Sequence, residues 1–152
     1  MSQVMKRWDH PAQGNGSHSY YCYGYGMQSA NFGETTYDWE HMPDKLLGAT
    51  QQEIDAVALF MYHCGVAVEM QFSPTGRGAN SWDVPYAIQH YFSYSNHADL
   101  KGRDEYSLVN WQNMLKDQFD IGWPVYYSGF SNSGGHAFVC DGYDDNDLFP
   151  FN

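Results

Sequence analysis

Basic residues are scarce in this sequence. Of its 152 residues, 7 are Lys or Arg and 18 are Asp or Glu, so the formal net charge is −11. Proteins that bind nucleic acids or anionic membrane surfaces use basic side chains to displace counterions from phosphates. We therefore expect no nucleic acid and no membrane among the partners of this chain.

Long hydrophobic runs are lacking as well. The longest apolar stretch, at about residues 56–70, is interrupted by His63 and Glu69, whereas a helix that crosses a bilayer needs about 20 consecutive apolar residues. The composition is nevertheless 43% hydrophobic and 18% aromatic, which is far richer in apolar side chains than a disordered acidic segment. We expect a soluble, folded protein.

Patterns typical of metal sites and disulfide scaffolds are also missing. Three cysteines are too few for a disulfide scaffold and form no CxxC pair, and the seven histidines form no H-x-x-x-H pair. We therefore expect no metal and no other cofactor. No cleavable leader is recognisable at the start, because residues 2–8 are typical of an amphipathic helix.

The apolar periodicity predicts helices first and strands later. Thr50 and Glu53 have the spacing of a capping box, and they begin a predicted helix over about residues 51–64 with Gly65 as its stop. The residues predicted to recur on its core face are Ile54, Val57, Ala58, Met61 and Cys64. The other predicted elements are a strand at 66–72, helices at about 82–92 and 107–119, and strands at 124–127, 135–143 and 148–152. This order favours an α+β architecture in a single domain over residues 1–152, with a helical part at about 1–120 and a sheet part at about 121–152.

One histidine follows two glycines at the start of a predicted strand. Gly134 and Gly135 precede His136, and glycine lets a peptide backbone approach closely because it has no Cβ. A peptide-binding cleft beside a catalytic imidazole has this pattern. A core histidine behind a glycine-rich turn has it too, and the residues alone leave both interpretations open.

A partner for this histidine follows from a hairpin between residues 135–143 and 148–152. With the turn centred on Asp144, His136 lies opposite Asn152, and directly opposed Cβ atoms are about 5 Å apart. An amide that orients an imidazole is one half of a Cys-His-Asn arrangement. A register shift of one residue would turn Asn152 to the other face.

None of the three cysteines suits the role of nucleophile. Cys64 lies at the end of the predicted helix, where the dipole raises a thiol pKa. Cys140 lies about 13 Å along the strand from His136 at about 3.3 Å per residue, and Cys22 lies in a Tyr-Gly loop. The residues therefore indicate a base and an orienting amide without their nucleophile.

The segment 134–142, with residues 124–129 just before it, resembles the catalytic-histidine region of the streptopain family of cysteine peptidases, to which interpain belongs. The resemblance extends through residues 37–43, 56–70 and 74–84. It implies a papain-like α+β fold, in which helices pack against an antiparallel sheet.

The resemblance also implies a role for particular residues. His136 would be the general base and acid, and Asn152 would lie beside the imidazole. The substrate-binding positions that match are Gly78, Ala79, Asn80, Ser81, Phe130 and Gly135. In the family the nucleophilic cysteine precedes a helix that residues 2–11 resemble, so we expect a truncated catalytic domain that lacks this cysteine and is inactive alone.

Partners and location follow from the same resemblance. Peptide or protein substrates are expected, together with the missing N-terminal segment or propeptide, and a secreted or periplasmic bacterial zymogen is typical of the family. The alternative is a catalytically inactive relative that binds peptides or a protein partner through its Tyr-rich acidic surface. A third hypothesis, metal-dependent hydrolysis, would require bound zinc.

Overall fold

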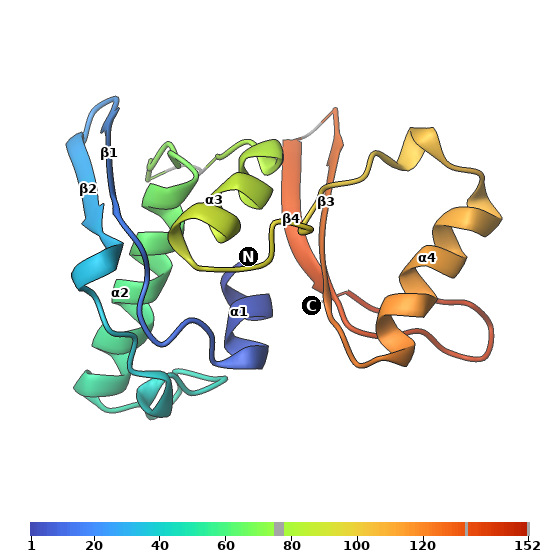
Figure 1. The fold of residues 1–152 in the computed structure, drawn as a ribbon, viewed down its shortest axis with the longest axis horizontal. Coiled ribbons are helices and arrows are strands. Elements are labelled where there is room, and N and C mark those ends of the chain that lie inside the picture. Colours follow the sequence, from blue (N-terminus) through green and yellow to red (C-terminus); the bar gives the residue numbers. More distant parts are fainter. Residues whose placement is uncertain (75–77, 133, 152) are drawn as a thin grey trace. The chain divides into compact units, whose positions relative to one another are not determined.

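The computed structural model describes residues 1–74, 78–132 and 134–151. The chain divides into two compact units, Met1–Leu100 and Lys101–Asn152, and each contains a two-stranded antiparallel sheet (Figure 1). No helix among the described residues is long and apolar enough to cross a membrane. That residues 1–152 form a single domain stays a prediction.

The first unit contains three helices and one hairpin. Its elements are α1 (Ser2–Trp8), β1 (Ser17–Cys22), β2 (Gly26–Asn31), α2 (Gln51–Ala67) and α3 (Val84–Tyr91), with short 3₁₀ turns at Phe32–Glu34, Trp39–His41 and Ser81–Asp83. The hairpin register runs from Ser17 opposite Asn31 to Cys22 opposite Gly26. The predicted helix at about 82–92 is therefore a 3₁₀ turn followed by α3.

Helix α2 begins as its sequence predicts and ends later. The Thr50 hydroxyl accepts a hydrogen bond from the Glu53 amide at 3.3 Å, and the Glu53 carboxylate accepts one from the Thr50 amide at 2.6 Å, which confirms the capping box. The helix continues through Gly65 to Ala67, and the left-handed residue beyond its end is Glu69, with φ 48°. The predicted strand at 66–72 is wrong, because its first residues are helical and Gln71 forms only an isolated bridge with Gly78.

An aromatic cluster forms the core of the first unit. Phe32 and Phe92 have centroids 5.4 Å apart, Tyr37 and Phe60 4.9 Å apart, and all four side chains are buried. The face of α2 that joins this cluster carries Phe60 and His63. Of the predicted core residues Cys64 is buried, whereas Ile54 and Met61 are exposed. The prediction was wrong because it treated His63 as polar, although its Nδ1 lies 3.0 Å from the buried Tyr37 hydroxyl.

The chain enters the hairpin through a tight crossing at Gly14. A Cβ added to Gly14 would lie 2.7 Å from the Phe32 Cβ and 3.0 Å from the Tyr91 carbonyl oxygen. The next amide, of Asn15, donates to the same Tyr91 oxygen at 2.9 Å. Three segments distant in the sequence therefore meet here with backbone against backbone.

The second unit packs one helix against its hairpin. Its elements are α4 (Leu108–Asp120), β3 (Val125–Ser131) and β4 (Gly134–Cys140). The Ser107 hydroxyl caps α4 by accepting from the Asn110 amide at 3.2 Å, which confirms the predicted start. Trp111 and Leu115 are buried, and the Trp111 ring meets Tyr127 of β3 edge to face at 5.9 Å. Gly129 pairs with His136 across the two strands.

Candidate active site

His136 lies on β4 and is exposed. Its cross-strand partner on β3 is Gly129, which brings no side chain against the imidazole. The interpretation of His136 as a core histidine is therefore wrong; among the described residues, the histidine that is buried is His63. An exposed imidazole on a strand can exchange protons with a bound molecule, which general acid–base chemistry requires.

The two glycines before His136 differ in their local role. Gly134 has φ +133°, a conformation that residues with a Cβ rarely adopt. A Cβ at Gly135 would make only ordinary contacts, 3.7 Å from the Gly129 oxygen and from the Phe130 Cβ. Gly134 is therefore needed by the turn, whereas Gly135 leaves bare backbone beside His136. Phe130, opposite Gly135, is 94% exposed.

The predicted pairing of β4 with the end of the chain has a different register. Phe151, and not Leu148, lies opposite Cys140. The carboxylate of Asp144 accepts from the amides of Asn146 and Leu148, both at 2.9 Å, so the acidic residues close a local turn and pairing resumes only at Phe151. Asn152, the predicted orienting amide, lies outside the described residues.

The predicted cleft loop belongs to the first unit. The Gln71 amide donates to the Gly78 oxygen at 2.8 Å, and the Asn80 side-chain oxygen accepts from the Trp82 amide at 3.2 Å. Gly78, Ala79 and Asn80 are exposed, and Ser81 is half-buried. The structure thus brings these four residues together in one loop, and it brings Phe130, Gly135 and His136 together on the β3–β4 hairpin.

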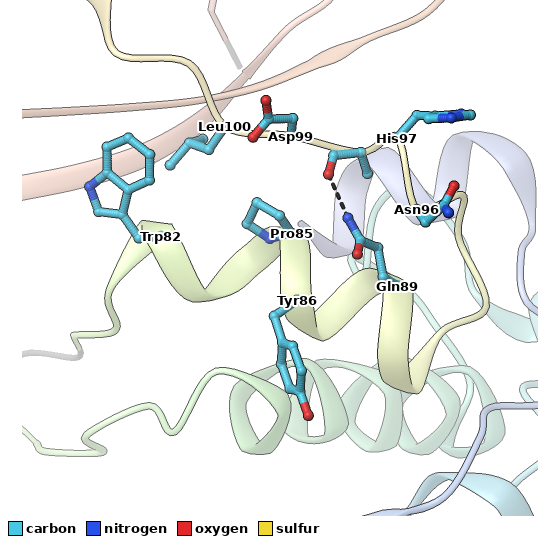
Figure 2. Close-up of a pocket in the computed structure, with 9 residues that line it drawn as sticks. Trp82, Pro85, Tyr86, Gln89, Asn96, His97, Asp99 and Leu100 are labelled. Atoms are coloured by element: carbon cyan, nitrogen blue, oxygen red, sulfur yellow. Dashed lines mark hydrogen bonds between the residues drawn. The ribbon is translucent and has the colours of Figure 1, made fainter.

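A cavity that the sequence did not indicate follows directly after this loop. It has a volume of about 610 Å³ and lies between the start of α3 and the segment 96–100. Figure 2 shows Trp82 and Leu100 at one end and Asn96 and His97 at the other, with Gln89 donating to the Ala98 carbonyl oxygen at 2.6 Å. In the sequence, the indication of this cavity is that Trp82 directly follows the predicted cleft residue Ser81. Its other wall, segment 96–100, shows no periodic pattern.

The cysteines of the chain are free and buried. Burial raises the pKa of the Cys64 thiol to about 12 and also raises the pKa of Cys140. Cys64 lies within α2 rather than at its end, so burial dominates where the sequence suggested the helix dipole. Neither thiol suits a nucleophile. Within the described part of the chain, no three His, Cys, Asp or Glu side chains are grouped so as to hold a metal ion.

Helices packed against an antiparallel sheet in this arrangement define a papain-like α+β fold, the fold of a class of cysteine peptidases. The sequence model of the Peptidase C10 family matches residues 1–152, and the chain belongs to this family.

Individual relatives are thiol proteases of bacteria. The chain is 35% identical over 156 residues to thiol protease/hemagglutinin PrtT of Porphyromonas gingivalis and covers 18% of that protein. It is 25% identical over 160 residues to streptopain of Streptococcus pyogenes and covers 40% of it. In each case 99% or more of this chain is matched, so the chain spans less than half the length of these relatives.

The fold is similar to that of interpain A from Prevotella intermedia. Active wild-type interpain A superposes with a TM-score of 0.91 and 37% identity, over 99% of this chain and 66% of that one. A prointerpain A fragment matches with the same score and identity, over 99% of this chain and 49% of the other. These findings confirm the predicted fold class and the predicted family.

Proposed function

We propose that this chain is part of a cysteine endopeptidase that hydrolyses peptide bonds by a Cys-His mechanism. Membership of the Peptidase C10 family supports the reaction class. The observation that carries the assignment to this chain is the exposed His136, which stands beside two glycines on β4 and opposite a third on β3.

In this proposal His136 moves the proton in both halves of the reaction. In the first half its imidazole takes the proton of a thiol, the thiolate attacks the scissile carbonyl, and the imidazolium protonates the leaving amine, which leaves an acyl-enzyme thioester. In the second half the imidazole takes a proton from a water molecule that attacks the thioester, and it returns that proton to the departing thiolate as the carboxylic acid is released. We assign Asn152 to orient the imidazole. The Cys140–Phe151 bridge has a different register from the one that placed Asn152 opposite His136, so this role rests on the resemblance to the family.

The thiol must come from a cysteine other than the three in this sequence. Cys22, Cys64 and Cys140 are buried, and a buried thiol that a substrate cannot reach is a poor nucleophile. We therefore propose that residues 1–152 are one truncated catalytic domain. The chain would supply the base and the cleft, and a longer polypeptide the nucleophile.

The proposed substrate-binding residues are Gly78, Ala79, Asn80, Ser81, Phe130 and Gly135. Extended peptides are bound through backbone hydrogen bonds, with side-chain pockets for specificity. The exposed backbone at Ala79 and Gly135 suits the first requirement, whereas the Gly78 amide and carbonyl already pair with Gln71. The 94% exposed ring of Phe130 offers an apolar contact for the second. We extend the proposal to peptide and protein substrates, to a propeptide as partner, and to a secreted or periplasmic location.

Peptide hydrolysis by the protein with its cysteine-bearing segment present tests this proposal. His136→Ala is expected to lower kcat by roughly 10²–10⁴-fold, the usual contribution of a general base and acid. His90→Ala is the matched control, because His90 is an exposed histidine on α3. Thiol alkylation is expected to remove the activity.

Two outcomes would contradict the proposal. Full activity of His136→Ala would exclude the imidazole from the mechanism. A folded protein that carries an exposed cysteine, hydrolyses nothing and still binds peptides would instead support the inactive, peptide-binding alternative.

A further inference from the structure

The outward face of the β1–β2 hairpin is built from small polar side chains and exposed rings. The register pairs Ser17 with Asn31, Ser19 with Ser29 and Tyr21 with Met27, and every member of these pairs is exposed. The intervening residues turn inward, as Tyr20, Cys22 and Ala30 show by their burial. One face of the hairpin therefore carries hydroxyls and an amide at its base and apolar groups toward its tip.

Exposed apolar side chains lie at the tip of the hairpin and on the residues beside it. Tyr21 is 65% exposed, Tyr23 87% and Tyr25 51%, and Met27 is 64% exposed. Tyr23 and Tyr25 stand in the loop between the strands, at the end of the hairpin that Figure 1 shows in dark blue. Exposed apolar groups that lie close together commonly mark a binding surface, and a tyrosine ring offers an apolar face with a hydroxyl at its edge.

Formal charge is missing from this region. Charged residues make up 16% of the chain, yet residues 10–33 contain no Asp, Glu, Lys or Arg. His18 is the residue of β1 that has an ionic partner. Its side chain is partly buried, and its Nε2 lies 3.0 Å from the Glu69 carboxylate. Apart from this His18–Glu69 pair beside the hollow, residues 10–33 offer a ligand no acidic or basic side chain, which favours a neutral ligand.

A hollow lies at the base of the same hairpin. Its volume is about 490 Å³, and Ser17, His18, Ser19, Ser29, Ala30 and Asn31 line it. Serine hydroxyls both donate and accept hydrogen bonds, and the asparagine amide does the same through separate atoms. Such a lining complements a ligand rich in hydroxyl groups, whereas a purely apolar partner would leave these polar groups unpaired.

Helix α2 holds the hairpin in place. The Tyr62 hydroxyl lies 3.3 Å from the amide and 3.3 Å from the carbonyl oxygen of Ser29, and Gln28 Nε2 donates to the Tyr25 oxygen at 3.0 Å. On the other strand, the Tyr20 hydroxyl donates to the Met70 carbonyl oxygen. A surface fixed in this way loses little conformational freedom on binding.

We propose that this face of the hairpin binds a neutral carbohydrate. Tyr21, Tyr23 and Tyr25 stack against the C–H faces of sugar rings, and the serine and asparagine side chains of the hollow hydrogen-bond to sugar hydroxyls. A neutral polysaccharide has both the apolar ring faces and the uncharged hydroxyls that this surface matches. The site lies within the first unit and does not depend on the proposed peptidase function.

Binding of the intact protein to defined polysaccharides tests the proposal. The probes are mannan, dextran and laminarin, which are neutral, and heparin, which is anionic, each immobilised for biolayer interferometry. At least one neutral polymer is expected to bind and heparin is not. The triple variant Tyr21→Ala, Tyr23→Ala, Tyr25→Ala is expected to weaken binding at least tenfold, whereas Tyr23→Phe, which keeps the ring, retains it.

Two further variants keep the result interpretable. Tyr86→Ala on α3 is the matched control, because Tyr86 is 57% exposed and lies off the hairpin, and it should bind as the unaltered protein does. Ser19→Asp places a carboxylate beside the hollow without removing a ring, and at least a fivefold loss is expected. Circular dichroism verifies that each variant is folded.

Several results would overturn the proposal. These are no binding to any of the three neutral polymers, equal binding of heparin, or unchanged binding by the folded triple variant. Tighter binding to uncharged phosphatidylcholine vesicles than to every polysaccharide would assign the face to a lipid surface instead.

Discussion

Acid is expected to destabilise the first unit through one buried side chain, His63. The residue is 5% exposed, and burial lowers its pKa below the ordinary value of 6.5. Its ring packs among aromatic rings, with centroids 5.3 Å from Phe32 and 5.8 Å from Tyr37. Below pH 6.5 an unfolded chain binds a proton here that the folded chain does not. The stability present above pH 6.5 is therefore lost as the pH falls through 6.5 toward the lowered pKa.

The size of this effect has a ceiling. One titrating group changes the free energy of unfolding by at most about 1.4 kcal/mol per pH unit. The unfolded chain takes up this proton only below about pH 6.5, so one pH unit of the interval from 7.5 to 5.5 contributes and the loss is at most about 1.4 kcal/mol. His41 acts with the opposite sign, because its hydrogen bond to Asp38 raises its pKa and protonation stabilises the folded state. The lowered pKa values of Asp38 and Glu53 keep these carboxylates ionised throughout this interval.

Urea unfolding at pH 7.5, 6.5 and 5.5, followed by tryptophan fluorescence, measures the contribution. His63→Asn is the comparison, because asparagine has polar atoms near the position of Nδ1, which faces the Tyr37 hydroxyl at 3.0 Å, and does not titrate. The difference in unfolding free energy between the two proteins should narrow by up to about 1.4 kcal/mol on acidification. A constant difference across the three pH values would refute the reasoning.

Two further predictions concern α2. Thr50→Ala removes the side-chain acceptor of the capping box and should lower the free energy of unfolding by about 1 kcal/mol. Thr50→Ser keeps the hydroxyl and should retain most of the stability that the cap provides. Equal urea midpoints for the alanine variant and the parent would be inconsistent with this. Iodoacetamide at pH 8 should leave Cys64 unlabelled in the native protein and label it in urea, because the thiol is buried with a pKa of about 12. Peptide mapping by mass spectrometry measures this, and labelling at the same rate in both conditions would argue against the burial.

The starts of helices were predictable because their chemistry is local. Thr50 with Glu53, and Ser107 alone, satisfy amides within three residues along the chain, and the structure has both caps. The end of α2 was not predictable in this way. Val66 and Ala67 are both buried in the core, and this tertiary burial extends the helix past Gly65.

Strand pairing was harder to predict because several partners compete. The acidic residues after β4 suggested a hairpin with residues 148–152, but Asp144 uses its carboxylate to close a local turn instead. The long partner of β4 is β3, whose pairing ends at Ser131 opposite Gly134. No residue pattern in the sequence distinguishes these two partners.

The sequence could propose candidate site residues one at a time, and their roles stay predictions. The Gly-Gly pair and the family resemblance both pointed to His136, which is exposed on β4. The cavity beside Trp82 went unnoticed, because its second wall, residues 96–100, is an irregular segment with no motif. Side chains brought together by a loop leave no periodic signal in a sequence.

The absence of a Cβ at Gly14 allows the close backbone contacts that fix the direction in which the chain enters the β1–β2 hairpin. The backbone on either side of it lies against Phe32 and against the last turn of α3. A side chain at this position would overlap Phe32 and the Tyr91 carbonyl oxygen at the end of α3, so the backbone leading into β1 would have to shift. Gly14 therefore influences the orientation of the Tyr-bearing tip from a position seven residues before Tyr21.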